Sequence, residues 1–506
     1  MIWFTNLNDA VVYPRQYTLT VVTPVVPGQG AYDNLPVVFF PTNTQTSYVL
    51  QTTGNPASGN WMTVTNGVPF TGLTVPAGTG TAFFRLAFEG QIVTQIAAGA
   101  QLSLFLKDDG SLWGMGDDSY GELGNAFINY IVNIPFDIIS NSVTTVSAGN
   151  NHSLFLKNDG SLWTMGGNQY GELGAGFYST NSPYGFFSPQ EITASNTIAI
   201  SGGGGFSLFL KNDGTVWGMG MNDSGQLGDG TYNQTDLPVQ MMISNVIAIA
   251  AAGGSHSLML KTNGSLWAVG EDNFGQLGDG NSFSTTLPEQ IVASNVTAIA
   301  AGGAYSLFIK KDGSLWVMGA NDSGQLGDGT YNQTNRPEQI VTNHVTAIAT
   351  RNSTSLFLKS DGSLWVMGAN DSGQLGDGTY NQTNRPEQIE PGNVMAIAAG
   401  GFHSLFVKND GSLWSMGAND SGQLGDDTYI QTNRPIQVTS TSNPLLGMTS
   451  QNHQPMIYFP TAAAPDYILQ MTTNLASGTW TTVTNPVSFS GLQITNAPSP
   501  AYFRLY

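Results

Sequence analysis

Short apolar runs alternate with polar turns throughout residues 91–440, and the pattern repeats about every 50 residues. One unit contains the apolar segments VTAIAAGG (296–303), SLFIK (306–310) and SLWVMG (314–319), the last two separated by a KDG turn. A polar segment, ANDSGQLGDGTYNQTNR, then leads to PEQIV (337–341). Runs of this length, bounded by Gly, Asn and Pro, predict four short β-strands that form an antiparallel sheet.

A tryptophan marks each copy of this unit, at intervals of 49 to 54 residues. Each one follows a lysine by six positions and a glycine by three, so the register is the same in all copies. A four-stranded unit cannot cover both of its apolar faces alone, and the copies therefore predict an all-β, seven-bladed β-propeller of four-stranded antiparallel blades. We expect the tryptophans to pack between neighbouring blades as structural positions. They are Trp113, Trp163, Trp217, Trp267, Trp316, Trp365 and Trp414.

Two of the copies, 312–340 and 361–389, are identical in sequence. A blade needs to match only its neighbours, so identical copies are physically tolerated, and we interpret this segment first as scaffold. Blade 2 is longer than the others because AGFYSTNSPYGFFSPQ replaces the usual polar loop. The spacing predicts blades at about 91–140, 141–193, 194–244, 245–293, 294–342, 343–391 and 392–440.

Outside the propeller we expect an extended segment over 1–35, an N-terminal β module over 36–90 and a C-terminal β module over 441–506. The two modules resemble each other: both have strand-like alternation, an ASG turn, a tryptophan (Trp61 and Trp480) and a closing aromatic-Phe-Arg-Leu segment. They also resemble small β-sandwich modules at the ends of bacterial exported proteins. We expect the modules to pack together or on partner chains, and the first segment to pair with a sheet edge.

Charge and composition limit the classes of partner. The chain of 506 residues carries 15 Lys and Arg against 34 Asp and Glu, a formal charge of −19. Such a chain repels a phosphate backbone, so we expect no nucleic-acid partner. It has no cysteine, which excludes thiolate chemistry. No apolar run approaches the roughly 18 residues of a membrane-spanning helix, and the first residues lack the pattern of an intact secretory signal.

Segments 253–282 and 400–428 follow the pattern AGGxHSLxLKxDGxLWxMGxNxxGQLGDGT. This pattern resembles the regulator of chromosome condensation repeat, and the resemblance covers roughly 91–440. It implies a seven-bladed propeller. It also implies protein recognition, because members of the family include a guanine-nucleotide exchange factor for the small GTPase Ran and a secreted propeller-type β-lactamase inhibitor. The acidic charge and the few lysines fit poorly with a chromatin-bound exchange factor.

Several polar residues recur at one register. His152, His256 and His403 precede Ser-Leu, but other blades place Leu102, Phe206, Tyr305 or Thr354 there, which indicates a structural position. The lysines beside the hairpin turns form either a basic ring for an anionic ligand or solvated side chains next to turn aspartates. They are Lys107, Lys157, Lys211, Lys261, Lys310, Lys359 and Lys408.

The NDSGQLGDGT loops are open to two interpretations. Asp322, Asp328, Asp371 and Asp377 have a spacing reminiscent of a calcium loop, but Asp and Asn beside Gly are also what tight turns use. The chain has no nucleophile elbow, P-loop, HExxH or dinucleotide-binding motif. We therefore expect no catalytic, cofactor-binding or metal-binding residues and no cofactor.

The first two blades depart most from the repeat, through NAFINYIVNIPFDII in blade 1 and the long loop of blade 2. Their aromatic residues form either a patch that anchors a partner or a hydrophobic lid on their own blades. The candidates are Phe127, Tyr130, Phe136, Phe177, Tyr178, Tyr184, Phe186 and Phe187.

The leading hypothesis is a noncatalytic scaffold, extracellular or at the cell surface, that binds protein or glycan through the loops of a rigid propeller. The cytoplasm is the alternative location. Three other functions stay open: a structural subunit of a surface assembly that self-associates through the terminal β segments, a propeller-type polysaccharide lyase or hydrolase, and an activity like that of a guanine-nucleotide exchange factor.

Overall fold

The computed structural model describes residues 92–124, 131–179 and 185–438, together with short strands in both terminal segments. The chain divides into two compact units, Gln91–Thr441 and a unit that joins Met1–Gly90 with Ser442–Tyr506. The described residues are all strand, turn or loop, and the predicted all-β class is confirmed.

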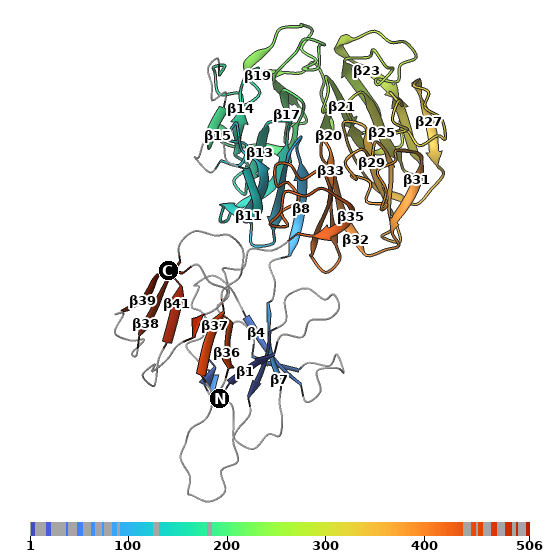
Figure 1. The fold of residues 1–506 in the computed structure, drawn as a ribbon. Helices are drawn as coiled ribbons and strands as arrows, with labels where there is room; N and C mark the ends of the chain where they lie inside the picture. Colours follow the sequence, from blue (N-terminus) through green and yellow to red (C-terminus); the bar gives the residue numbers. More distant parts are fainter. Residues whose placement is uncertain are drawn as a thin grey trace, which may run out of the picture. The chain divides into compact units, whose positions relative to one another are not determined.

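Seven four-stranded sheets make up the first of these units, and the predicted seven-bladed propeller is confirmed (Figure 1). Blade 1 contains β8 (Val93–Ala98), β9 (Leu102–Lys107), β10 (Leu112–Asp117) and β11 (Ile131–Ile139), and blade 2 contains β12 (Val143–Ala148), β13 (His152–Lys157), β14 (Leu162–Gly167) and β15 (Gly185–Thr193). Blade 3 contains β16 (Thr197–Gly202), β17 (Phe206–Lys211), β18 (Val216–Gly220) and β19 (Thr235–Gln240), and blade 4 contains β20 (Val246–Ala251), β21 (His256–Lys261), β22 (Leu266–Gly270) and β23 (Thr285–Val292).

The last three blades have the same order of antiparallel strands. Blade 5 contains β24 (Val296–Ala301), β25 (Tyr305–Lys310), β26 (Leu315–Gly319) and β27 (Thr334–Val341), and blade 6 contains β28 (Val345–Arg351), β29 (Thr354–Lys359), β30 (Leu364–Gly368) and β31 (Thr383–Glu390). Blade 7 contains β32 (Val394–Ala399), β33 (His403–Lys408), β34 (Leu413–Gly417) and β35 (Thr432–Gln437). Each sheet lies inside one of the segments expected for a blade.

The strands described in the terminal unit form one five-stranded sheet and three smaller sheets. β1 (Ile2–Thr5), β2 (Tyr17–Val21), β7 (Phe83–Phe88), β4 (Tyr48–Thr53) and β5 (Met62–Thr65) form one sheet in that order, and β3 (Val37–Val38) pairs with β6 (Leu73–Thr74). β36 (Gly447–Gln451), β37 (Gln454–Tyr458) and β40 (Leu492–Gln493) form another, as do β39 (Thr481–Val487), β38 (Tyr467–Thr472) and β41 (Tyr502–Leu505). The predicted association of the terminal modules depends on side chains outside the described residues.

The hydrophobic core lies between blades. Each cluster of buried residues combines strands of one blade with the tryptophan and an apolar residue of the next blade, as when Trp316 and Met318 pack on Leu258 and Leu266. Six of the tryptophans stack on a phenylalanine of the neighbouring strand, such as Phe308 beside Trp316 at 6.1 Å between ring centroids. All seven are half-buried. Every one of these clusters therefore joins two neighbouring blades.

The ring closes without a shared strand. Blades 1 and 7 each draw all four strands from one continuous segment, and Val93 and Phe105 pack against Leu405 and Val407. The backbone N–H of Val93 donates to the carbonyl of Gly411 at 3.3 Å, which repeats the bond between Val345 and Gly313 in adjacent blades. Closure thus uses the same contacts as every other blade junction.

The strands alternate in direction, so the loops separate onto two faces. The loops between first and second strands, such as 302–304, and between third and fourth strands, such as 320–333, emerge together, and we name this the loop face. The hairpin turns, such as 311–314, and the connections between blades emerge at the opposite end, the turn face. The predicted turn glycines have positive φ, for example 77° at Gly313, as tight hairpins require.

Candidate functional site: the loop face of the propeller

A buried asparagine holds each long loop of blades 3, 5, 6 and 7 in one conformation. In blade 6 the Oδ1 atom of Asn370 accepts a hydrogen bond from the N–H of Leu375 at 2.9 Å. Its Nδ2 donates to Asp377 Oδ1 and to the carbonyls of Thr379 and Asn381, at 3.1, 3.2 and 3.1 Å. The asparagine is completely buried, so the loop is fixed before any partner arrives. Its equivalents are Asn222, Asn321 and Asn419.

Each of these rigid loops presents a tyrosine to solvent at the same register. The side chains are 45 to 56% exposed, which is high for large aromatic residues. They are Tyr232, Tyr331, Tyr380 and Tyr429. Two further apolar residues, Phe283 and Ile430, are 78% and 73% exposed one position later in the loop register. The loop face thus carries a repeated set of exposed aromatic and apolar side chains, which we call the aromatic rim.

An exposed arginine lies beside several of these loops. A Cβ built on Gly329 would lie 2.7 Å from Nη2 of Arg385, and one on Gly378 would lie 2.6 Å from Nη2 of Arg434. Each guanidinium therefore lies over the loop of the preceding blade, close in sequence to that loop's exposed tyrosine. Both glycines have positive φ, so this close approach uses the conformation and the small size of glycine. The rim combines aromatic faces with cationic donors.

Sequence reasoning treated this repeated segment as scaffold and did not select its tyrosines. The available signal was the letter pattern TYNQT, in which an aromatic residue stands among turn formers that have no need of it. Identical copies are compatible with scaffold, but a scaffold turn does not require a tyrosine that is about half exposed.

Five of the predicted partner-binding aromatic residues lie in the described chain. Phe177 is 46% exposed, and its ring is 4.9 Å from that of Phe186. Tyr178 shares the register of the exposed tyrosines and donates to the carbonyl of Gln234 in blade 3, at 3.4 Å. Phe136 packs on the core between blades 1 and 2. Phe187 is partly buried on β15, and the candidates Phe127, Tyr130 and Tyr184 lie outside the described residues.

Arg351 occupies the centre of the ring. We call the loops between the first and second strands, such as 302–304, the inner loops. Arg351 stands where the other inner loops have a glycine, such as Gly302. It is 5% exposed and extends from blade 6 toward the opposite blades. Its Nη1 donates to the carbonyl of Ala148 at 2.9 Å and its Nη2 to Oδ1 of Asn150 at 2.8 Å. A Cβ built on Gly253 of blade 4 would lie 3.5 Å from its Cγ. Burial lowers the pKa of Arg351 to about 10, so the guanidinium stays charged at neutral pH.

The recurring histidines connect adjacent blades. His152, His256 and His403 are fully buried, and each Nε2 lies 2.9 Å from a serine hydroxyl of the next blade. Ser103, the partner of His403, donates its own proton to the carbonyl of Gln423 at 2.7 Å. The imidazole must therefore donate from Nε2. Burial lowers the pKa of all three to about 3, which keeps them neutral at physiological pH.

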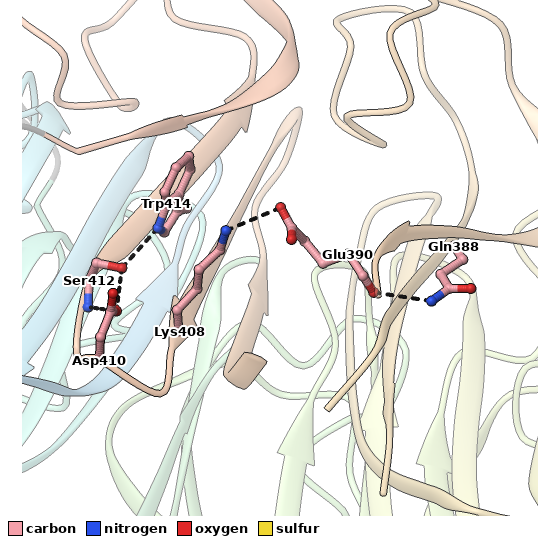
Figure 2. Close-up of polar contacts among 6 residues, drawn as sticks. All are labelled: Gln388, Glu390, Lys408, Asp410, Ser412 and Trp414. Atoms are coloured by element: carbon pink, nitrogen blue, oxygen red, sulfur yellow. Dashed lines mark hydrogen bonds and ion pairs between the residues drawn. The ribbon is translucent and has the colours of Figure 1, made fainter. Parts of the chain in front are cut away.

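The repeated lysines lie on the turn face against their own tryptophans. Every Nζ is 3.6 to 4.5 Å from the centroid of the indole ring six positions later, a cation–π geometry. Figure 2 shows the group in blade 7, where the Ser412 hydroxyl joins Asp410 to the indole N–H of Trp414. Lys408 also lies 3.4 Å from Glu390 of blade 6. These ammonium groups thus interact with the hairpins that carry them.

The loop aspartates accept bonds from their own loops. Asp328 and Asp377 bind the N–H and hydroxyl of the threonine two residues later, and Asp322 and Asp371 are exposed. Among the described residues, no group of three or more His, Asp or Glu side chains is placed to hold a metal. Within the same part of the chain, no helix is long and apolar enough to cross a bilayer.

Comparison with known proteins agrees with this geometry. The RCC1-like domain model matches residues 179–457, more than half of the chain, and the regulator of chromosome condensation (RCC1) repeat matches residues 93–122, 143–172 and 109–156. The chain belongs to the RCC1-like domain family. No curated protein matches the sequence.

Solved structures show the same fold. Human WBSCR16 is 23% identical with a TM-score of 0.56, and the match covers 63% of this chain and 88% of that one. Prp20p from Saccharomyces cerevisiae is 20% identical with a TM-score of 0.58, and the match covers 71% and 90%. At this level of identity, the similar structures show the architecture. They do not identify a partner of this chain.

Proposed function

We propose that the RCC1-like propeller is a noncatalytic binding module that holds a protein or a glycan on its loop face. The observation that carries this proposal is the set of four tyrosines, exposed at one register on loops that buried asparagines keep rigid. Exposed aromatic side chains are favoured anchors because they bury a large area while losing few rotatable bonds. A fixed loop adds little ordering cost on binding.

Repetition supports the same function. Four tyrosines on neighbouring blades can engage a partner that is itself extended or repetitive, and the combined affinity then exceeds that of one contact. Arg385 and Arg434 add donors suited to carboxylate groups. Among solved relatives, Prp20p is described with binding properties to Gsp1p and histones, and in complex with Kap60. Those protein partners support a recognition role for this fold.

We place the module outside the cell or at its surface, on the resemblance of its terminal segments to exported β modules. Fractionation of the source cells tests this location, and recovery in the cytoplasm would contradict it.

The binding proposal is tested on protein and glycan arrays with the full chain and two variants. The first changes Tyr232, Tyr331, Tyr380 and Tyr429 to Ala. The second is a matched control that changes the exposed residues Ile198, Ile247 and Met395, near the turn face, to Thr, which is the residue of other blades at that position. We expect wild type and control to bind the same partner and the tyrosine variant to lose at least tenfold in affinity. Equal binding by all three would reject the aromatic rim as the site.

A further inference from the structure

Blade 4 differs from blades 3, 5, 6 and 7 at the residue that organises the long loop. Asp272 replaces the asparagine, and its side chain is completely buried. Its Oδ1 atom accepts a hydrogen bond from the N–H of Leu277 at 2.8 Å, as the asparagine Oδ1 does in the other blades. Its Oδ2 atom has no hydrogen-bond partner. A donor of the repeat has therefore become an acceptor at the same place.

The loop around Asp272 keeps the conformation of the other blades. The N–H of Asn281 donates to Asp279 Oδ1 at 2.8 Å, which matches the bond from Thr379 to Asp377 in blade 6. The N–H of Phe283 donates to Oδ1 of Asn281 at 2.7 Å, just as the N–H of the equivalent blade 6 residue donates to a side-chain oxygen two positions earlier. The same oxygen atoms therefore surround the position of the missing amide.

In blade 6 those oxygens are Asp377 Oδ1 and the carbonyls of Thr379 and Asn381, and all three accept from one NH2 group. Their blade 4 equivalents are Asp279 and the carbonyls of Asn281 and Phe283. By this equivalence, the unpartnered Oδ2 atom of Asp272 takes the position of a donor that meets only acceptors in blade 6. Inside the protein, repulsion between oxygens is poorly screened. A positive ligand must replace the lost hydrogens.

We propose that blade 4 binds a hard cation such as Ca²⁺ between the carboxylates of Asp272 and Asp279 and the carbonyl oxygens of Asn281 and Phe283. Ca²⁺ prefers oxygen ligands from carboxylates and backbone carbonyls. A site with two carboxylates indicates a dissociation constant of about 0.1 to 1 mM, the range of extracellular calcium-binding modules.

A proton is the competing ligand for this position. Burial, with Asp279 and Glu289 nearby, raises the pKa of Asp272 to about 7, and the guanidinium of Arg336 lies against the neighbouring Gly280. The cation binds the ionised carboxylate, whereas a protonated Asp272 can donate to Asp279 in its place.

Asp118 in blade 1 has the same unpartnered Oδ2 atom, and burial raises its pKa to about 7 as well. The loop that follows it lies outside the described residues, so the proposed site is confined to blade 4. Asp118 is unchanged in all the variants below, so any effect of Asp118 on calcium binding or stability is the same in each of them.

The experiment is calorimetric titration of the metal-free full chain with CaCl2 at pH 8, for wild type, Asp272→Asn and Asn370→Asp. Asp272→Asn restores the residue of the neighbouring blades, and Asn370→Asp creates the blade 4 arrangement in blade 6. We expect Asp272→Asn to bind one Ca²⁺ fewer than wild type and Asn370→Asp to bind one more. Without calcium, the melting temperature of Asp272→Asn should be higher than that of wild type. Addition of calcium should raise the melting temperature of wild type more than that of Asp272→Asn.

Equal stoichiometry and equal calcium shifts in wild type and Asp272→Asn would overturn the site. So would a difference between these two proteins that depends on pH but not on calcium, because a proton alone would then occupy the position. Titration with MgCl2 in parallel reports whether the site accepts the smaller cation, and a lower dissociation constant for Mg²⁺ than for Ca²⁺ would contradict the assignment to calcium.

Discussion

Nη2 of Arg351, in blade 6, lies 2.8 Å from Oδ1 of Asn150, in blade 2, so one side chain connects blades on different sides of the ring. The same guanidinium donates to the carbonyl of Ala148. Its Nε atom has no partner among the described residues. Arg351 therefore links blade 6 to blade 2, and these two blades share no hydrophobic cluster among the described residues.

Replacing Arg351 with Gly, the residue of the other inner loops, should destabilise the propeller by about 2 to 3 kcal/mol. The carbonyl of Ala148 and Oδ1 of Asn150 would lose charge-assisted donors in a buried site. Urea unfolding followed by tryptophan fluorescence measures this, since seven of the 10 tryptophans lie in the blades. The exposed Arg385→Ala serves as control, with a change within about 0.5 kcal/mol. Unchanged stability of Arg351→Gly would show that the desolvation of the charge cancels its bonds.

The blades were predictable because local signals repeat. Turn glycines, a tryptophan at fixed distance and a short apolar period define four strands per unit, and every unit agrees with the others. Arg351 was not predictable in the same way. Arg351 is the only exception to glycine at its register in the seven blades, and its long side chain could point to solvent or to the axis. Only the positions of blades 1 and 2 across the ring decide its direction.

The histidines and loop residues show a similar division. A structural role for His403 was predicted because Leu, Phe, Tyr or Thr stands at its register in other blades. Its partner, Ser103, lies 300 positions away across the closing junction. The exposed tyrosines were not selected because identical copies of their segment were interpreted as scaffold. Asp272 was not selected because Asp and Asn are equally common in turns. The replacement of an amide NH2 by a carboxylate oxygen matters only where acceptors surround the side chain.

A second prediction concerns the pairing of glycine and bulk in the inner loops. A Cβ built on Gly302 would lie 2.1 Å from the ring of Tyr305. Blade 6 avoids this clash because Thr354 takes the place of the tyrosine and leaves room for Arg351. We expect Gly302→Ala and Tyr305→Thr each to lower the free energy of unfolding. The loss in the double variant should be smaller than the sum of the two single losses by roughly 1 to 2 kcal/mol. Simple additivity in urea unfolding would contradict this coupling.

A third prediction follows from the buried histidines. The pKa of His403 is about 3 in the folded chain, lowered by burial and by the charge of Arg351, against a reference value of 6.5. As the pH falls, the unfolded state binds this proton before the folded state does. The contribution of neutral His403 to the free energy of unfolding is therefore fully present above pH 6.5 and is lost as the pH falls toward 3. Replacing His403 with Leu, the residue of blade 1, removes this loss. Between pH 7 and 5 the variant should gain about 2 kcal/mol relative to wild type.

The measurement for His403→Leu is the free energy of unfolding at several pH values, with the exposed His344→Asn as control. His344 has a φ of 68°, which asparagine adopts at the equivalent position of other blades. The control should follow wild type at every pH. A pH profile of His403→Leu that is parallel to wild type would mean that His403 is not kept neutral.

The last prediction separates the two interactions of a turn-face lysine. Lys408 lies 4.1 Å from the centroid of Trp414 and 3.4 Å from Glu390, whereas Lys359 lies 3.9 Å from Trp365 and has Val341 at the position of the glutamate. Lys359→Met should cost about 0.5 to 1 kcal/mol through the lost cation–π contact. Lys408→Met should cost up to about 1 kcal/mol more, since a partly exposed ion pair is also lost.

Salt distinguishes these terms, because screening weakens the ion pair between Lys408 and Glu390 more than the short contact of the ammonium with the ring. The difference between the two variants should therefore disappear in about 1 M NaCl, at which the Debye length is roughly 3 Å. Thermal unfolding of both variants at low and high salt measures it. If the difference persists at high salt, the extra stability of Lys408 comes from packing of its aliphatic stem, and the ion pair contributes nothing measurable to the junction of blades 6 and 7.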